Sequence, residues 1–544
     1  MSRPEEKGIT PVRTPSAGTG TAILLALLAV LGGCTLGPDF IRPQTEVNDY
    51  WSTKGNPRVA TETSVDRQWW SAFNDPALDQ LISIASQENL PLQIAALRIM
   101  EARARLGLAI GGQYPQQQEA FGSATSHRLS KNAPNSLAAD RHHWDYQVGF
   151  DALWEMDFWG KFRRDVEASH ADLSASVADY DDALVSLIGE VARTYTLIRT
   201  FEVLIELAGE NVQLQEEGLR IAESRLRNGV TTELDVTQAR TLLESTRAAI
   251  PQLEARLRQA QNALGTLLGR PTGSVQAYLK ERRSIPVAPV TVAVGMPAEL
   301  LRRRPDIRSA ELAAAAQCAR IGIAKADLYP SFSLLGEIGV QTSSQGGVRS
   351  GHANLSNLWD SQSIFYTFGP RVKWPLFHYG RLKNQVRIQD ARFQQLLVNY
   401  QNTVLKAGQE VEDSLTGFLK AGETEVFGQK AVNAARRSVE IALTQYKEGA
   451  ADYQRVLDTQ RALLQEQNNL AQARSAIATN LIALYKALGG GWELRRGQPV
   501  LAESTRSGME KRTDWGRLLA PQPAAETGKL PAAGEFPVLL KPDW

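Results

Sequence analysis

The chain contains one sequence pattern written twice, and this duplication constrains the fold more than any other feature. Residues 105–109 (RLGLA) recur 215 residues later as residues 320–324 (RIGIA). Further along, the offset becomes 220 residues, and the paired positions are Trp154 with Trp374, Gly229 with Gly449, and Leu268-Gly269 with Leu488-Gly489. An offset that stays constant over roughly a hundred residues indicates a tandem duplication, so both halves should supply the same elements.

Each copy carries two segments with the alternation of β-strands. Residues 144–155 and 363–374 alternate large apolar residues with polar or small ones, and residues 117–128 and 331–342 precede them as hairpin partners. This alternation, with aromatic residues at the ends, is typical of strands in a membrane barrel, and a soluble sandwich with one wet face is the alternative.

Two such hairpins supply four strands, which cannot close into a barrel. An open strand edge in lipid leaves backbone groups unpaired, at a cost of several kcal/mol each. If the strands lie in a membrane, several chains must therefore combine, and twelve strands from three chains would enclose a lumen.

A long helix and a returning helix follow each hairpin. Apolar residues recur every three or four positions from Val166 to Ile198, and the same stripe returns from Val386 to Phe418, as in a coiled coil. Residues 163–228 would form a helix about 100 Å long. Gly229 and its counterpart Gly449 are expected to end the long helices, because glycine favours a left-handed cap.

The chain divides into six expected segments. Residues 1–33 are expected to be a lipoprotein signal peptide, and residues 34–68 a lipid-anchored N-terminal segment. The first repeat would span residues 69–270 (helix, hairpin, long helix, returning helix) and the second residues 306–492. A linker with five prolines, residues 271–305, joins them, and residues 493–544 form a Pro/Ala-rich tail expected to lack a core.

The N-terminus predicts export. Residues 21–31 are apolar but too short to cross a bilayer, which is typical of a signal sequence. The small residues before Cys34 resemble a bacterial lipobox, in which this cysteine is lipidated; a signal with a chance cysteine is the alternative. Thr35 follows instead of the aspartate that often retains lipoproteins at the inner membrane, so the outer membrane is favoured. The other cysteine, Cys318, is expected to be a packing residue.

Composition and motifs argue against other classes of protein. With 60 basic and 59 acidic residues, the net charge of +1 offers no field for nucleic acid. No glycine-rich phosphate loop, nucleophile elbow or zinc-binding helix motif is present, so neither an enzyme nor a cofactor is expected, apart from the lipid on Cys34. The pair His142-His143 is expected at a solvent-facing loop tip, and no metal site is expected.

The motifs resemble those of the TolC-type outer-membrane efflux proteins, in the NodT-like lipoprotein branch. The matching segments are residues 33–43, 70–76, 303–308, 449–458 and 487–492. The resemblance implies an α+β membrane protein, a homotrimer with a twelve-stranded transmembrane barrel and a periplasmic coiled-coil tunnel of tandem-duplicated helical hairpins. It further implies a passive exit duct for small molecules, acting with a periplasmic adaptor (membrane fusion) protein and an inner-membrane, proton-driven RND-type pump.

The resemblance also implies a gate at the periplasmic helix tips, beside the turns at Gly229 and Gly449. Asp235 matches an aspartate that bonds across to the neighbouring hairpin in relatives. Tyr446 matches the tyrosine that receives this bond. Solvated tip charges are the alternative for these positions.

Asp458 matches an aspartate that forms a ring in the pore of relatives, and Arg461 matches an arginine beside it. A threefold ring of carboxylates narrows a pore and attracts cations. Relatives often carry a second acid where this chain has Arg455, and some carry an arginine where it has Ala451. Cation selectivity and the lock between hairpins are therefore expected to be weaker here.

Two other functions remain open. A lipid-anchored periplasmic coiled-coil scaffold or adaptor without a pore would explain Cys34 and the helices, but not the duplicated strands. A type I secretion duct is the alternative within the class of channels.

Overall fold

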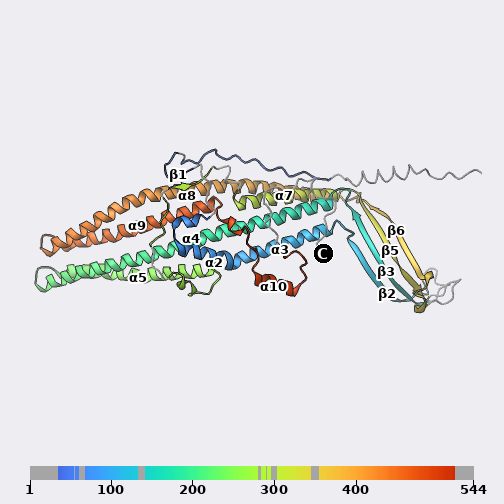
Figure 1. The fold of residues 1–544 in the computed structure, drawn as a ribbon, viewed down its shortest axis with the longest axis horizontal. Coiled ribbons are helices and arrows are strands. Elements are labelled where there is room, and N and C mark those ends of the chain that lie inside the picture. The colour runs from blue at the N-terminus through green and yellow to red at the C-terminus, as the bar shows by residue number, and fades with distance from the viewer. Residues whose placement is uncertain are drawn as a thin grey trace, which may run out of the picture.

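The computed structural model describes residues 35–53, 55–60, 68–132, 141–279, 284–289, 291–295, 303–344 and 354–520. Two pairs of long helices extend away from one end of a four-stranded sheet, and shorter helices pack around their middle and along the part nearest the sheet (Figure 1). In these ranges, no helix has both the length and the apolar character needed to cross a bilayer.

The long helices lie where the duplicated pattern predicts them. Helix α4 runs from Lys161 to Arg227 and α8 from Arg381 to Lys447, so each has 67 residues and extends about 100 Å. Helices α5 (Glu233–Leu267) and α9 (Tyr453–Ala487) return beside them. The predicted apolar stripe is buried where the helices cross the main core, as at Ile198 and Phe418.

The duplication is repeated in the backbone geometry. Three glycines of the first copy adopt positive φ angles, and so do their counterparts 220 residues later. The pairs are Gly160 and Gly380 (φ 74° and 81°), Gly229 and Gly449 (71° and 76°), and Gly269 and Gly489 (67° and 69°). The same turns therefore begin and end the helices in both copies.

Shorter elements build the middle of the molecule. They are η1 (Trp69–Phe73), α2 (Pro76–Glu88), α3 (Leu90–Gly111), η2 (Ser274–Ala277), α7 (Pro305–Ala326), η5 (Trp492–Arg495) and α10 (Glu503–Arg512), with β1 (Val59–Ala60) paired to β4 (Val292–Ala293). Their apolar residues enclose the main core, in which Trp69 stacks on Tyr485 with ring centroids 5.3 Å apart. Asp75 caps α2 by accepting a hydrogen bond from the amide of Ala77.

The described part of the C-terminal segment packs against this core, so the expected lack of a core is wrong for residues 493–520. Met509 and Leu519 are buried among the core residues. Arg495 forms a buried ion pair with Asp181 of α4, with 2.5 Å between Nε and Oδ1. Composition alone misses this contact because it depends on a few apolar side chains and one ion pair.

The sheet contains β2 (Gln117–Arg128), β3 (His142–Met156), β5 (Ser331–Ser343) and β6 (Ile364–Lys373) in the order β2-β3-β5-β6, and every neighbouring pair is antiparallel. Both hairpins follow the alternation seen in the sequence. The pairing of β3 with β5 joins the two copies into one sheet. Two short 3-10 helices (elements labelled η), η3 (Leu355–Asn357) and η4 (Ser361–Ser363), precede β6.

Candidate functional site

The two faces of the sheet differ in chemistry. The register places Phe150, Ile338 and Tyr366 side by side on one face, where they are 66%, 59% and 78% exposed. The opposite face carries polar pairs such as Asp151 with Glu337. A continuous exposed apolar surface beside a polar face is the arrangement of a strand layer with lipid on one side and water on the other.

The sheet is open at both edges within one chain. Among the described strands, β2 and β6 each have a single neighbour, so each leaves one row of backbone donors and acceptors without a strand partner. Such an edge is a template for pairing with another chain.

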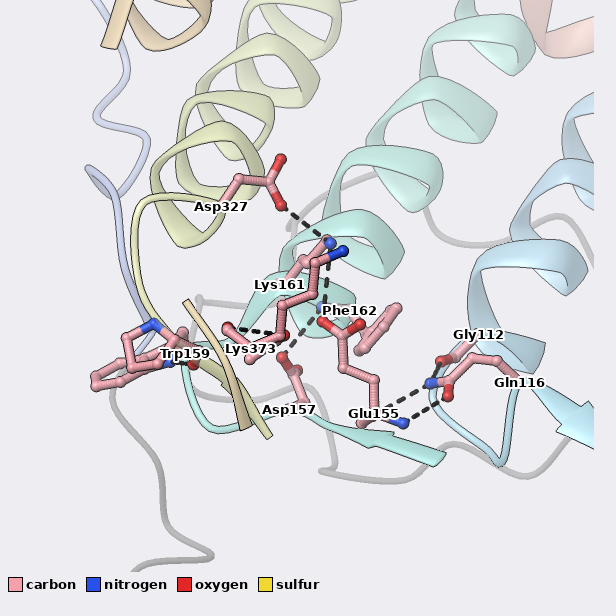
Figure 2. Close-up of polar contacts among 11 residues, drawn as sticks. Gly112, Gln116, Glu155, Asp157, Trp159, Lys161, Phe162, Asp327 and Lys373 are labelled. Atoms are coloured by element: carbon pink, nitrogen blue, oxygen red, sulfur yellow. Dashed lines mark hydrogen bonds and ion pairs between the residues drawn. The ribbon is translucent and has the colours of Figure 1, made fainter. Parts of the chain in front are cut away.

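Polar contacts fix the sheet to the long helices. Lys161, at the start of α4, points between two carboxylates, with Nζ 3.0 Å from Asp327 and 3.8 Å from Glu155 (Figure 2). The side-chain nitrogen of Gln116 donates to the backbone carbonyls of Gly112 and Glu155. Its side-chain oxygen accepts a hydrogen bond from the backbone amide of Glu155 at 2.7 Å. These contacts join the end of α3, the end of β3 and the start of α4.

A second set of contacts begins α4 in a defined direction. The Asp157 carboxylate accepts hydrogen bonds from the amides of Phe162 and Arg163, which are free donors in the first helical turn. The Trp159 indole donates to the Pro330 carbonyl at 2.7 Å. These hydrogen bonds fix the direction in which α4 leaves the sheet.

At the other end of the molecule, the two hairpin tips contact each other. The Thr231 hydroxyl donates to the Asp235 carboxylate and accepts from the Tyr446 hydroxyl at 3.5 Å. Burial raises the pKa of the Tyr446 phenol, and the negative charge of Asp235 acts in the same direction. The phenol is therefore protonated at neutral pH and acts as a donor. The structure thus brings Asp235 and Tyr446 together through Thr231, which the sequence did not identify.

Arg225 is a second tip residue that sequence reasoning missed. Its Nη1 donates to the last carbonyls of α8, at 2.7 Å to Tyr446 and 3.2 Å to Lys447, and its guanidinium lies 4.8 Å from the centre of the Tyr446 ring. A cation at a helix C-terminus satisfies free carbonyls and the negative end of the helix dipole. Its place four residues before Gly229, in the last turn of the expected helix, is the sequence feature from which its role at the tip could have been predicted.

Asp458 and Arg461 lie on an exposed surface of α9. The carboxylate of Asp458 accepts from the Gln454 amide at 3.0 Å and lies 3.9 Å from the Arg461 guanidinium. Arg455 is exposed, and its amide donates to the Asp452 side chain that caps α9. Within one chain, these side chains form a solvated surface at the tip.

The structure describes one of the two cysteines, Cys318. Cys34 and the expected signal peptide lie outside the described residues. Cys318 is buried in α7 beside the Pro38 carbonyl, and burial raises the pKa of its thiol to about 11. The prediction that Cys318 is a packing residue is confirmed.

The expectation for His142-His143 is wrong. Both residues belong to β3 instead of a loop tip, and His143 is only 8% exposed. The strand extends this far because Arg128 and His127 of β2 continue to pair with them. His143 also lies beside His127 and Asp145, a cluster that the sequence did not predict.

Comparison with known proteins identifies the family. The profile of the family described as outer membrane efflux protein matches residues 81–270 and 296–490. The chain is 32% identical over 465 residues to the cation efflux system protein CusC of Escherichia coli O6:H1, covering 85% of this chain and 97% of that protein. It is 32% identical over 437 residues to the pyoverdine export outer membrane protein OpmQ of Pseudomonas putida, covering 79% and 89%.

A solved structure gives the same result for the fold. The outer-membrane channel OprN superposes with a TM-score of 0.78 at 31% identity, covering 85% of this chain and all of that chain. Both family segments coincide with the duplicated halves, and the proteins that match across them are efflux channels, not enzymes. The chain therefore belongs to the outer membrane efflux protein family and is an outer-membrane efflux channel.

Proposed function

We propose that three copies of the chain close a twelve-stranded barrel in the outer membrane and a helical tunnel beneath it. The observation that carries this proposal is the four-stranded sheet, which has an exposed apolar face and, among the described strands, two edges without a strand partner. Pairing β2 of one copy with β6 of the next removes every open edge, which a bilayer requires. Four strands from each of three chains give a barrel wide enough for a water-filled lumen.

The helices near the sheet support the same closure. Helix α4 packs against both α3 and α7, whereas the matching part of its counterpart α8 packs against α7. Ile388, Val398 and Leu405 of α8 are exposed apolar residues, and so is Leu108 of α3. By the duplication, α3 corresponds to α7 and α4 to α8, so α3 of a neighbouring copy would cover α8 as α7 covers α4. The strands and the helices of three copies would then each form a closed ring around the same axis, with their elements in matching order.

The helix tips would form the gate of this duct. Three copies of Asp458 around one axis would place carboxylates at its narrowest part, with Arg461 beside each one. The contact from Thr231 to Asp235 and Tyr446 would hold the two hairpins of a chain together in the resting state. Arg455, where relatives often carry an acid, would weaken the selection of cations.

The start of the described chain supports lipid anchoring through Cys34. Thr35, the next residue, packs on Gly160, where a Cβ atom would lie 2.4 Å from the threonine methyl group. Leu36 donates its amide to the Trp159 carbonyl at 3.1 Å. A lipid on Cys34 would therefore lie where the sheet meets the helices, at the expected inner surface of the outer membrane.

The duct would receive its cargo from a periplasmic adaptor and an inner-membrane pump of the RND type. Two relatives at the same identity carry names for different cargo, cations and pyoverdine. Cargo would therefore be selected by the pump, and the duct would need only a wide polar path. A scaffold without a pore would not explain why the sheet exposes an apolar face. A type I secretion duct is the alternative that would use the same architecture, with proteins as its cargo.

Single-channel conductance in planar bilayers tests this function. We expect small currents from the wild-type protein and larger ones from Asp458→Ala, because the substitution removes charge and volume from the constriction. Glu440→Ala is the matched control, since Glu440 is also exposed and paired with an arginine three residues away, but on α8. Correctly assembled protein that never conducts would contradict the channel, and equal effects of the two substitutions would contradict the gate.

A further inference from the structure

The end of β2 and the start of β3 lie at the side of the sheet farthest from the helices (Figure 1). Three side chains with metal-binding donors meet there. His127 of β2 pairs directly with His143 of β3 in the strand register, and Asp145 follows two residues later on the same face. Asp145 pairs with Ser343, the last residue of β5, so His143 lies beyond the end of that strand. Among the described residues, these three form the one group of such donors.

The donor atoms already converge on one point. Nε2 of His127 lies 3.3 Å from Oδ2 of Asp145, and Nε2 of His143 lies 3.9 Å from the same oxygen. One donor atom from each residue lies within 4.8 Å of the other two, and the imidazole rings stack with centroids 5.1 Å apart. Zinc–nitrogen and zinc–oxygen bonds of about 2.0–2.2 Å separate neighbouring ligands in a tetrahedral site by about 3.3 Å. The separation of His127 from Asp145 already matches this spacing, and that of His143 from Asp145 exceeds it by about 0.6 Å.

We infer that His127, His143 and Asp145 form a binding site for a divalent first-row transition-metal ion such as Zn²⁺. Two imidazole nitrogens and one carboxylate oxygen are ligands that these ions prefer, whereas Mg²⁺ and Ca²⁺ prefer oxygen alone. Three protein ligands leave a fourth position for water or for another ligand. His143 is nearly buried and belongs to a strand, so one ligand is held in place before the ion arrives.

The location of the cluster gives the site its consequence. These residues share the polar face of the sheet with Gln147 and Asp151, opposite the apolar face. In the barrel proposed above, the site would face the lumen at the outer mouth; only this placement rests on the proposed function. A bound ion would join β2 to β3 beyond the end of β5 and would place positive charge at the exit.

A carboxylate that neutralises one protonated imidazole would produce a similar cluster without a metal. The two arrangements differ in a simple way. A metal site takes up one ion per chain, and its affinity falls when either histidine is removed. An imidazolium–carboxylate pair takes up no metal, and only its response to pH changes with these substitutions.

The test is metal uptake by the full-length protein in detergent, freed of any histidine tag and stripped with a chelator. Zn²⁺ binding is measured by equilibrium dialysis and elemental analysis, with the visible spectrum of Co²⁺ as a second readout of coordination. We expect one ion per chain in the wild type. His127→Ala should weaken binding at least about 100-fold, since even a residue that only orients a ligand contributes about 10–100-fold.

The matched control is His142→Ala, because His142 neighbours His143 in sequence but points to the opposite face. This variant should bind Zn²⁺ like the wild type, whereas Asp145→Asn and the double variant His127→Ala/His143→Ala should lose binding and the Co²⁺ spectrum. Equal uptake by the wild type and the double variant, both correctly assembled, would overturn the proposal. Because the readout is metal content, this result is distinct from a failure to conduct.

Discussion

At the scale of single residues, Arg304 shows how one guanidinium holds three helices together. Arg304 precedes α7, and its Nε and Nη2 donate to the Asp306 carboxylate at 3.0 and 2.8 Å. Its Nη1 donates to Glu410 of α8 and to the Ala487 carbonyl at the end of α9, both at 2.8 Å. Since the side chain is almost fully buried, these partners replace the water that it loses on folding.

We expect Arg304→Ala to lower the free energy of unfolding by about 2–4 kcal/mol. The substitution leaves the carboxylates and a helix-terminal carbonyl without their charged donor. Arg303→Ala is the control, because Arg303 is more exposed and makes one ion pair, with Glu493 at 3.1 Å. That variant should lose less than about 1 kcal/mol. Thermal unfolding of the two variants measures the difference, and equal midpoints would contradict the account.

At the scale of elements, the ends of α4 and α8 are set by the same local structure. The amide of Gly229 donates to Leu226 and that of Val230 to Arg225, which satisfies two terminal carbonyls. Gly449 and the residue after it repeat this pattern at the end of α8. Both glycines have positive φ, where a side chain is strained. The sharp turns of both hairpins therefore depend on glycine.

We predict that Gly229→Ala destabilises the tip by about 1 kcal/mol, which corresponds to roughly fivefold faster hydrogen exchange in the turn. No atom of the described residues lies within 4 Å of the added Cβ, so the cost arises from the backbone conformation. Gly209→Ala, in the interior of α4, also meets open space within the chain and should instead slow local exchange. Faster exchange in both variants would refute this explanation.

The sequence predicted long regular elements well and contacts between them poorly. The helices and strands could be located because periodicity persists over many residues and because glycines mark the helix ends. Alternation shows which face of a strand is apolar but not which strand lies beside it, so the β3–β5 pairing could not be predicted. The Arg225–Tyr446 contact joins residues 221 positions apart, and its formation depends on how two hairpins pack.

The candidate site was predicted in the same uneven way. Asp235 and Tyr446 could be selected by resemblance, and the structure places both beside Thr231. The cluster at His143 was missed because an isolated histidine pair carries no spacing signal. Only the register of β2 against β3 brings His127 next to it.

At the scale of the whole molecule, the sheet and the helices nearest to it carry exposed apolar surface. Among the described strands, the two edge strands of the sheet each lack a second strand partner, and the apolar face is exposed at Phe150 and Tyr366. Contacts between neighbouring helices give the order α3-α4-α7-α8, which matches the strand order β2-β3-β5-β6. The exposed apolar residues of α3 and α8 therefore lie at the same two edges as β2 and β6. Copies related by rotation about a common axis would satisfy both layers together, since a heterologous contact that closes produces a ring.

The most direct test of this closure is a single-particle structure of the full-length protein in lipid nanodiscs. We predict three subunits around one axis, with β2 of each hydrogen-bonded to β6 of the next and Phe150 facing lipid. A monomer in the membrane, or an assembly in which the edges of β2 and β6 stay unpaired, would contradict the account.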